Sequence, residues 1–559
     1  IRYNSTNYMK SDILQKELLN ILGDRFSESE SVRTNYSHGE DIFDPILPQA
    51  VVFPNNNEEI SKIIKLCNDN NVPITPFGTG TSLEGHALGN KDGITISLEN
   101  MNKILKINEE DFDCRVQAYV TRKQLNEELK DKGLFFPIDP GADASLGGMA
   151  STSASGTMAV RYGTMKTVVS GLTVILPNGE IIDTGVRTKK TSAGYNLTNL
   201  FIGSEGTLGI ISEVHLRLSP IPENIMSAVC HFPDLESSVL AAQEIIQYGI
   251  PVARIEMLNK DQMEISINYS NLQNMEIKPT LFFEFHGSES SNKESIEIAQ
   301  EITKNNQGTE FKWAQSTEER NKIWQARHDA YYAVKSQGNN IRVYTTDVCV
   351  PISNLVECIK FAENEIGNYG LKAPMVGHVG DGNFHAAIIY DPKKKEDYKM
   401  IRDFSDKLVE KALTLEGTVT GEHGVGIQKK DYLLKEHPDN IHLMNSTIRN
   451  IQLVAVIFVL IATVIAFFLE IRDMYVDQDI GLADLLLLFI YIEVIGLVRS
   501  YWETRSIRIS YPLVIAITAL ARFIILQDKE GDPTNLLYIS GAILIVALAT
   551  VVIRFRNSK

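Results

Sequence analysis

Residues 50–85 read "AVVFPNNNEEISKIIKLCNDNNVPITPFGTGTSLEG" and predict a strand, a helix, a second strand and a glycine-rich loop. Apolar residues that return every three or four positions, at Ile60, Ile63 and Ile64, indicate the helix. In the loop, glycines permit close approach of a ligand, and backbone N–H groups with threonine and serine hydroxyls can donate to a pyrophosphate. The loop departs from a dinucleotide fingerprint because its third glycine, Gly85, comes too late. We expect a phosphate cradle, with a plain surface loop as the alternative.

Two further stretches rich in small residues follow this cradle. They are "DPGADASLGGMASTSASGTMAVRYG" (139–163) and "GSEGTLGIISEVHLRLSP" (203–220). Such segments cannot build a core, but they can wrap closely round a flat, polar ligand. The three stretches together predict one long cofactor that lies across the domain.

Later in the chain, "GHVGDGNFH" (377–385) places two histidines on either side of a turn. Asp381 and Gly382 both accept positive φ and predict a two-residue hairpin loop. His378 would then pair directly with His385, with both imidazoles on one face and their Cβ atoms roughly 5 Å apart. Such a pair can hold a metal ion. Ordinary half-buried strand histidines are the alternative.

Composition sets limits on the function. A chain of 559 residues is too long for one core and predicts two or more domains. The formal net charge of −16 argues against a nucleic-acid surface. Five cysteines without a CxxC pair fit buried thiols in a reducing compartment.

The last part of the chain has a different character. "LVAVIFVLIATVIAFFL" (453–469) is an uncharged apolar run, and three more runs follow at 485–498, 509–526 and 536–553. Each is near the length that crosses a hydrocarbon core, so the pattern predicts four transmembrane helices. Arginines and lysines alternate between the connecting loops, which predicts that both termini face the cytoplasm. The expected location is the cell inner membrane, multi-pass, with the preceding domains in the cytoplasm.

Five motifs occur in a shared order: "PFGTGTSLEGH", "DPGADASLGGMASTSASG", "GSEGTLGIISEV", "GHVGDGNFH" and "GTVTGEHGVG". Over roughly residues 40–440 the chain resembles the FAD-dependent D-lactate dehydrogenases and their glycolate-oxidase and D-2-hydroxyglutarate-dehydrogenase relatives, in the vanillyl-alcohol-oxidase superfamily. This resemblance implies an α+β fold, with a two-part FAD-binding domain (41–222) and an α+β cap (223–446) that carries a metal site, after a lead-in (1–40).

The resemblance also assigns residues to the cofactor. FAD is expected to be noncovalent, because His86 after the cradle does not match the attachment motif. The pyrophosphate residues are Pro76, Gly78, Thr79, Gly80, Thr81, Ser82 and Gly85. The flavin and ribityl residues are Pro140, Gly141, Ser145, Gly147, Gly148, Thr152, Ser155 and Gly156. Glu205, Gly206 and Ile210 are expected near the adenine end.

The resemblance implies that His378, His385 and Glu422 bind a divalent ion, whereas Asp381 shapes the turn. Zinc, manganese or iron(II) suits two imidazoles and a carboxylate, and open coordination positions remain for a 2-hydroxy acid. His423 is the expected general base, because histidine can hold a proton near neutral pH. The alternative for His423 is a residue that supports the ligands or donates to the flavin.

A substrate anion needs a cation. Arg327 lies in "IWQARHDAYYAV" (323–334), which predicts one helix with Trp324 and Tyr331 on the same face. The resemblance implies that Arg327 binds the substrate carboxylate. Without the resemblance, an arginine on the surface of a helix is the better interpretation. The segments "TTDVCVP" and "WQARHDAYYAV" look most like the D-lactate branch, so D-lactate is preferred to glycolate and hydroxyglutarate.

The end of the cap departs from the family, because the chain turns into apolar sequence near residue 447 where relatives continue for about fifty residues. Residues 447–559 resemble the phosphate-starvation-inducible PsiE-like membrane proteins, on "ISYPLVIAITALARFII" and the four-span layout. Three accounts stay open. A tethered dehydrogenase passes electrons to a membrane quinone or cytochrome; or the flavin domain is a sensor or inactive partner of the membrane domain; or two unrelated genes are joined.

Overall fold

The predicted strand–helix–strand forms as β2 (Ala50–Val52), α3 (Asn57–Asn70) and β3 (Ile74–Phe77). The helix begins where the Asn56 side chain accepts the Glu59 backbone N–H, and it ends at Asn71, whose φ is +54°. The apolar stripe of α3 is buried, as its periodicity predicts. These elements build a sheet in the order β1 (Phe26–Ser27), β2, β4 (Ile94–Ser97), β3, in which the last three strands are parallel.

The structure is a computed structural model that describes residues 6–338, 340–437, 440–478, 480–504, 516–517, 519–520, 540–545 and 547. The chain divides into two units, Ile1–His437 and Pro438–Lys559. The finer division at residues 40, 222 and 446 stays a prediction.

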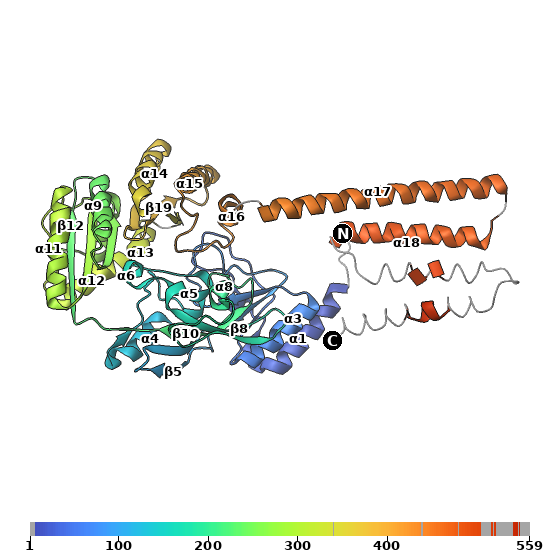
Figure 1. The fold of residues 1–559 in the computed structure, drawn as a ribbon, viewed down its shortest axis with the longest axis horizontal. Coiled ribbons are helices and arrows are strands. Elements are labelled where there is room, and N and C mark those ends of the chain that lie inside the picture. Colours follow the sequence, from blue (N-terminus) through green and yellow to red (C-terminus); the bar gives the residue numbers. More distant parts are fainter. Residues whose placement is uncertain are drawn as a thin grey trace. The chain divides into compact units, whose positions relative to one another are not determined.

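An antiparallel sheet completes the first half of the first unit. Its order is β5 (Ile104–Asn108), β6 (Asp113–Gln117), β10 (Ile210–Arg217), β8 (Val169–Ile175), β9 (Ile181–Gly185). β7 (Leu134–Phe135) pairs with β11 (Ser219–Pro220). The helices of this half are α1 (Thr6–Leu22), α2 (Glu30–Asn35), α3, α4 (Arg122–Leu129), α5 (Leu146–Thr152), α6 (Ala159–Tyr162), α7 (Met165–Val168) and α8 (Leu197–Phe201). This half has two sheets, the layout expected of a two-part FAD-binding domain, and we refer to it as the FAD-binding half (Figure 1).

The second half of the first unit, the cap, is built on one antiparallel sheet. Its order is β15 (Lys312–Trp313), β12 (Asn224–His231), β14 (Thr280–Gly287), β13 (Val252–Leu258), β18 (Met375–His378), β19 (Asn383–Tyr390), β16 (Arg342–Thr345), and β17 (Val348–Cys349) also pairs with β19. The expected α+β class is confirmed.

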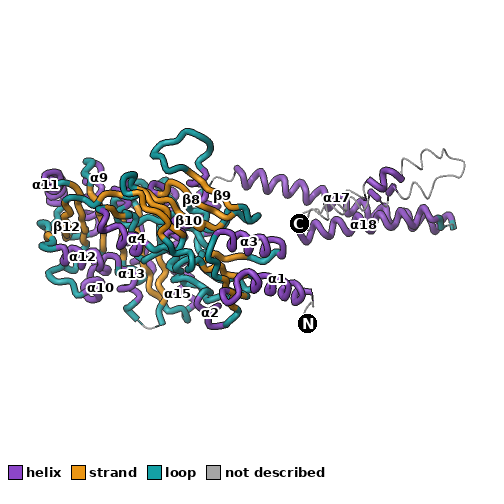
Figure 2. The backbone as a smooth tube through the Cα atoms, turned by 90° about the horizontal axis from the view of Figure 1, so that it is seen from below, coloured by secondary structure: helices purple, strands orange, loops and turns teal. Residues whose placement is uncertain are grey.

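Helices cover both faces of the cap sheet, and Figure 2 shows β12 between α9 and α11 on one side and α10 and α12 on the other. The main core holds side chains of α9 (Leu235–Gln247), α11 (Glu289–Asn305), α14 (Leu355–Tyr369) and α15 (Lys395–Thr414). The opposite face carries α10 (Lys260–Ser270), α12 (Thr317–His328) and α13 (Ala330–Lys335). α16 (Lys430–Glu436) closes the unit. The predicted single helix over 323–334 is wrong, because Asp329 separates α12 from α13.

The hairpin of residues 377–385 forms with a different register from the predicted one. His378 pairs with Asn383, and His385 pairs with Val376, so the loop has four residues rather than two. Gly382 alone in this loop has positive φ, at +82°. The direct pairing of His378 with His385 is therefore wrong, but the two still share a face because residues 383 and 385 lie two positions apart. The face is the one that carries α10, α12 and α13, since Phe384 points into the opposite core.

The second unit contains α17 (Asn440–Asp477) and α18 (Leu482–Thr504), which run antiparallel beside each other (Figure 1). The first two predicted spans fall on these helices, whereas 509–526 and 536–553 lie largely outside the described residues. Among the residues that the structure describes, no helix reaches the length and apolar character needed to cross a membrane. The predicted four-helix transmembrane bundle is therefore not supported.

Candidate functional site

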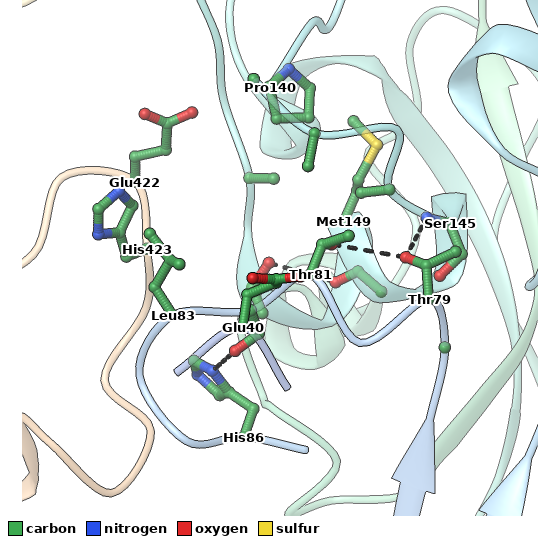
Figure 3. A pocket seen from close by; sticks show the side chains of 18 of the residues that line it. Glu40, Thr79, Thr81, Leu83, His86, Pro140, Ser145, Met149, Glu422 and His423 are labelled. Atoms are coloured by element: carbon green, nitrogen blue, oxygen red, sulfur yellow. Dashed lines mark hydrogen bonds between the residues drawn. The ribbon is translucent and has the colours of Figure 1, made fainter. Parts of the chain in front are cut away.

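One cavity of the first unit is lined by both halves, the FAD-binding half and the cap. Figure 3 shows Glu422 and His423 on one segment, facing the loops that carry Thr79, Thr81 and Ser145. The cradle and the second small-residue stretch are joined directly, since the Ser145 N–H donates to Thr79 Oγ1 at 3.3 Å. His378, His385 and Glu422, the predicted metal ligands, line the same cavity.

Most of the predicted cofactor residues line this cavity. Those that line it are Pro76, Gly78, Thr79, Gly80, Thr81, Ser82, Pro140, Gly141, Ser145, Gly147, Gly148, Thr152, Glu205, Gly206 and Ile210. Gly85, Ser155 and Gly156 are not among the lining residues. A Cβ on Gly85 would lie 2.7 Å from Phe43, and one on Gly156 would lie 2.4 Å from the Asp139 carbonyl carbon. These two glycines serve packing within the protein.

Glycines of the cavity wall are also needed for contact between loops. A Cβ on Gly78 would lie 2.4 Å from Ser145 Oγ, and a Cβ on Gly147 would lie 2.5 Å from the Cβ of Ala118. By contrast, a Cβ on Gly141 would meet only a carbonyl oxygen, at 3.6 Å. Backbone and hydroxyl donors of residues 78–82 line the cavity, which is the donor set that a pyrophosphate requires, so the wall fits FAD.

The three predicted metal ligands converge in the structure. His378 Nε2 and His385 Nε2 lie 3.0 Å and 3.5 Å from the same Glu422 oxygen, Oε2. The two imidazoles are perpendicular, with ring centres 5.5 Å apart. All three residues are nearly enclosed, and their ligand atoms lie within 4.8 Å of one another. This arrangement of N, N and O donors fits a divalent ion.

The second nitrogen of each imidazole is also held, which is typical of metal-binding histidines. His378 Nδ1 lies 2.8 Å from Glu256 Oε1, and His385 Nδ1 lies 3.0 Å from the carbonyl oxygen of Thr346. Burial opposes protonation of His378, but the carboxylates of Glu256 and Glu422 outweigh it and raise the pKa of this imidazole. The backbone N–H of Asp381 donates to the His378 carbonyl, so this residue fixes the turn.

Arg327 extends the cluster by one further charge. Its Nη2 lies 2.5 Å from Glu256 Oε2, so Glu256 stands between the guanidinium and His378. The Arg327 side chain is buried and lines the cavity, and its Nε makes no hydrogen bond to any residue that the structure describes. Unused buried donors that face a cavity fit a carboxylate ligand. The surface-arginine alternative for Arg327 is wrong.

Trp324 and Tyr331 do not share one helix face as predicted, because they lie on the separate helices α12 and α13. Trp324 packs against Arg254, whose guanidinium lies 4.5 Å from the indole ring centre. Tyr331, on the separate helix α13, lines the cavity. His328 also lines it, and burial lowers its pKa to about 4.

His423 lies beside the cluster and lines the cavity. Its ring stacks on that of His385 with centres 4.7 Å apart and nearly parallel planes. Its backbone N–H donates to Asp347 Oδ2 at 2.8 Å, and its Nδ1 lies 3.2 Å from Glu84 Oε1. Burial opposes protonation of the ring, but Asp347 and Glu84 outweigh it and raise the pKa of His423.

Sequence reasoning missed the buried charges around these histidines, Glu84, Glu256, Asp347 and Lys429. Lys429 Nζ lies 2.9 Å from Glu84 and 3.1 Å from Asp347. A second group of potential metal ligands consists of Asp347, His385 and His423, whose ligand atoms lie within 4.8 Å of one another. However, Asp347 already accepts from Lys429 and from the backbone of the 420–423 segment, so it is poorly suited to a second cation. In the sequence, three of them were visible only as a charged residue within a motif, Asp347 in "TTDVCVP", Glu84 in "TSLEGH" and Lys429 in "GIQKK", whereas Glu256 lies in none of these motifs.

Three stretches of the chain match models of known protein families. Residues 48–185 match the "FAD binding domain", residues 221–448 the "FAD linked oxidases, C-terminal domain", and residues 448–558 the "Phosphate-starvation-inducible E family". "Probable D-lactate dehydrogenase, mitochondrial" of Danio rerio is 46% identical over 413 residues, which are 73% of this chain and 83% of that protein. "D-lactate dehydrogenase [cytochrome], mitochondrial" of Arabidopsis thaliana is 43% identical over 70% of this chain and 69% of its own.

Solved structures show the same fold at low sequence identity. The 4-ethylphenol oxidase from Gulosibacter chungangensis has a TM-score of 0.64 at 16% identity, over 79% of this chain and 94% of that one. An alkyldihydroxyacetonephosphate synthase has a TM-score of 0.60 at 18% identity, over 72% of this chain and 81% of that one. From these matches and the cavity that they cover, the chain belongs to the family of FAD-linked oxidases that includes the D-lactate dehydrogenases, and it is an FAD-linked oxidoreductase with a C-terminal segment of the PsiE family.

Proposed function

We propose that this protein oxidises a D-2-hydroxy acid, first of all D-lactate, to the 2-oxo acid, with FAD and a divalent metal ion. The observation that carries the proposal is that one cavity is lined both by the cradle and by His378, His385, Glu422, His423 and Arg327. The names of the most similar relatives support D-lactate as the substrate.

Bound FAD would supply a two-electron acceptor, and a divalent ion held by the three-residue cluster would supply Lewis acidity toward a hydroxyl. Oxidation of the alcohol removes one proton from its hydroxyl and a hydride from the adjacent carbon. His423 takes the hydroxyl proton at Nε2, the ring nitrogen that Glu84 leaves available.

Arg327 binds the substrate carboxylate through its guanidinium, whose Nε donor has no partner among the described residues. Glu256 holds the guanidinium in place and at the same time orients His378. Arg327, at the carboxylate end of the substrate, and His378, among the ligands at its hydroxyl end, thereby share one buried partner, Glu256.

The acceptor that reoxidises the flavin is proposed to be a quinone or a cytochrome, in line with the relatives named D-lactate dehydrogenase [cytochrome]. The PsiE match and the exposed apolar side chains of α17 and α18 support attachment to a membrane. The most exposed include Phe458, Phe468 and Phe489, at 72%, 63% and 61%. Reduced enzyme mixed with a short-chain quinone or with ferricytochrome c would identify the acceptor by the rate of flavin reoxidation.

The substrate is tested by mixing the purified protein anaerobically with a panel of D- and L-2-hydroxy acids. D-lactate should bleach the visible flavin band faster than glycolate, D-2-hydroxyglutarate or L-lactate. A bound flavin that no hydroxy acid reduces would overturn the proposal and favour a sensor role for the flavin domain.

A further inference from the structure

A buried carboxylate from the FAD-binding half reaches the proposed base in the cap. Glu84 lies two residues after Ser82 in the cradle loop, and its side chain is 1% exposed. Its Oε1 lies 3.2 Å from His423 Nδ1. A carboxylate can only accept, so this contact places the neutral imidazole's proton on Nδ1 and leaves Nε2 as the acceptor.

The same carboxylate is held in place from the other side. Lys429 Nζ, on a side chain 4% exposed, lies 2.9 Å from Glu84 Oε1 and also 3.1 Å from Asp347 Oδ2. Asp347 in turn accepts the backbone N–H of His423. Both the ring and the backbone of His423 are thus fixed by carboxylates that share one buried ammonium.

Backbone contacts join the same two segments. The Glu84 carbonyl accepts from the N–H groups of Ile427 and Gln428, at 2.9 Å and 3.2 Å. Glu205, also from the FAD-binding half, accepts from Val425 and Gly426. The segment that carries His423 is therefore seated on the loops that line the cofactor end of the cavity.

We propose that Glu84 is a positioning residue for His423, an inference that rests on the proposed function. Glu84 holds the imidazole in the tautomer and orientation that present Nε2 to the substrate hydroxyl, and Lys429 holds Glu84. The base thereby depends on a residue more than three hundred positions away, in the domain that binds the flavin.

The test measures anaerobic flavin reduction by D-lactate in wild type, Glu84→Gln, His423→Ala and the double variant. The amide of Glu84→Gln can donate to Nδ1 and so permit the wrong tautomer. We expect a fall of about 10- to 100-fold in the limiting rate, part of the contribution of a general base. The apparent KM should change by less than about 3-fold, because ground-state binding is retained.

The double variant separates positioning from a merely structural effect. Since Glu84 acts through His423, Glu84→Gln should cause no further loss in the His423→Ala background. If the losses of the two single variants multiply in the double variant, the inference is overturned but the proposed function is not. The same holds if Glu84→Gln is fully active beside an active wild type. A wild type that no D-2-hydroxy acid reduces would overturn the proposed function, and the inference with it.

Two further variants complete the design. If Glu84→Gln fails to fold or to retain FAD, Glu84→Asp keeps the charge opposite Lys429 but draws the carboxylate back by one methylene. It should lower the limiting rate with little change in KM, and an unchanged rate would overturn the inference. Glu58→Gln, at an exposed position of α3, is the matched control and should behave as wild type.

Discussion

The two walls of the cavity are built from opposite chemistry. The wall from the FAD-binding half consists of glycines, small residues and hydroxyls, and it presents mainly backbone to the cofactor. The wall from the cap holds buried imidazoles, carboxylates and a guanidinium within contact of one another. The first wall works through shape, which a single added methyl group disturbs. The second works through charge, which a single lost partner unbalances.

The largest effect is expected on the charged wall, from His385→Ala. This change removes one of three proposed metal ligands, and even residues that only orient such ligands contribute about 10- to 100-fold. Turnover of D-lactate should therefore fall by more than about 100-fold and should not return on addition of metal. His437→Ala, an exposed histidine of the same unit, is the control. A fully active His385→Ala enzyme would contradict the assignment.

Arg327→Met should act next most strongly, and on substrate binding. A charge-assisted hydrogen bond contributes about 1.5–3 kcal/mol, so the KM for D-lactate should rise by roughly 10- to 100-fold. Arg327→Lys keeps the charge but loses the planar fork, and it should restore only part of the affinity. Steady-state kinetics would check this, and an unchanged KM in both variants would remove Arg327 from the substrate site.

The shape-based wall is tested by Gly78→Ala. The added Cβ would lie 2.4 Å from Ser145 Oγ, a hydroxyl that can rotate away, so we expect the lower end of the overpacking cost of about 1–3 kcal/mol and a fall in FAD affinity of about 10-fold. Gly367→Ala, on an exposed turn of α14 with no atom near the new methyl group, should leave FAD affinity unchanged. Titration of the apoprotein with FAD measures both. Equal affinities would show that the cradle tolerates side chains.

The smallest effect concerns the cap away from the cavity. Burial lowers the pKa of His231 to about 4, so between pH 4 and pH 6.5 the unfolded chain binds a proton that the folded cap does not. Stability should therefore decrease as the pH falls, by roughly 1–2 kcal/mol between about pH 7 and about pH 5 for this group. Urea unfolding, followed by tryptophan fluorescence, should show a flatter pH dependence for His231→Gln. Parallel profiles would exclude His231 as the cause.

The difference between the walls also explains what the sequence could predict. Gly78, Gly80 and Thr79 lie within a few residues of one another, so their joint role is visible in a short segment. The shared face of His378 and His385 follows from the two-residue period of a strand. Their exact register does not follow from this period, because the four-residue loop packs closely against Val350. A Cβ on Gly382 would lie 2.0 Å from the Val350 carbonyl oxygen.

Glu84, Glu256 and Lys429 are different, since their roles depend on contacts between distant segments. Glu256 meets His378 because β13 pairs with β18, across more than one hundred positions. Local propensity and periodicity carry no information on that pairing. The break between α12 and α13 was missed for a similar reason, because "WQARHDAYYAV" has helical residues throughout, and tertiary packing decides where Asp329 ends the helix.

The most direct test of the central claim, that the charged cluster activates a substrate beside the flavin, is the rate of anaerobic flavin bleaching by D-lactate before and after chelation of the protein. We predict fast bleaching that chelation suppresses and that zinc, manganese or iron(II) restores, with FAD retained throughout. Bleaching at an unchanged rate in the chelated, metal-free protein would contradict the account.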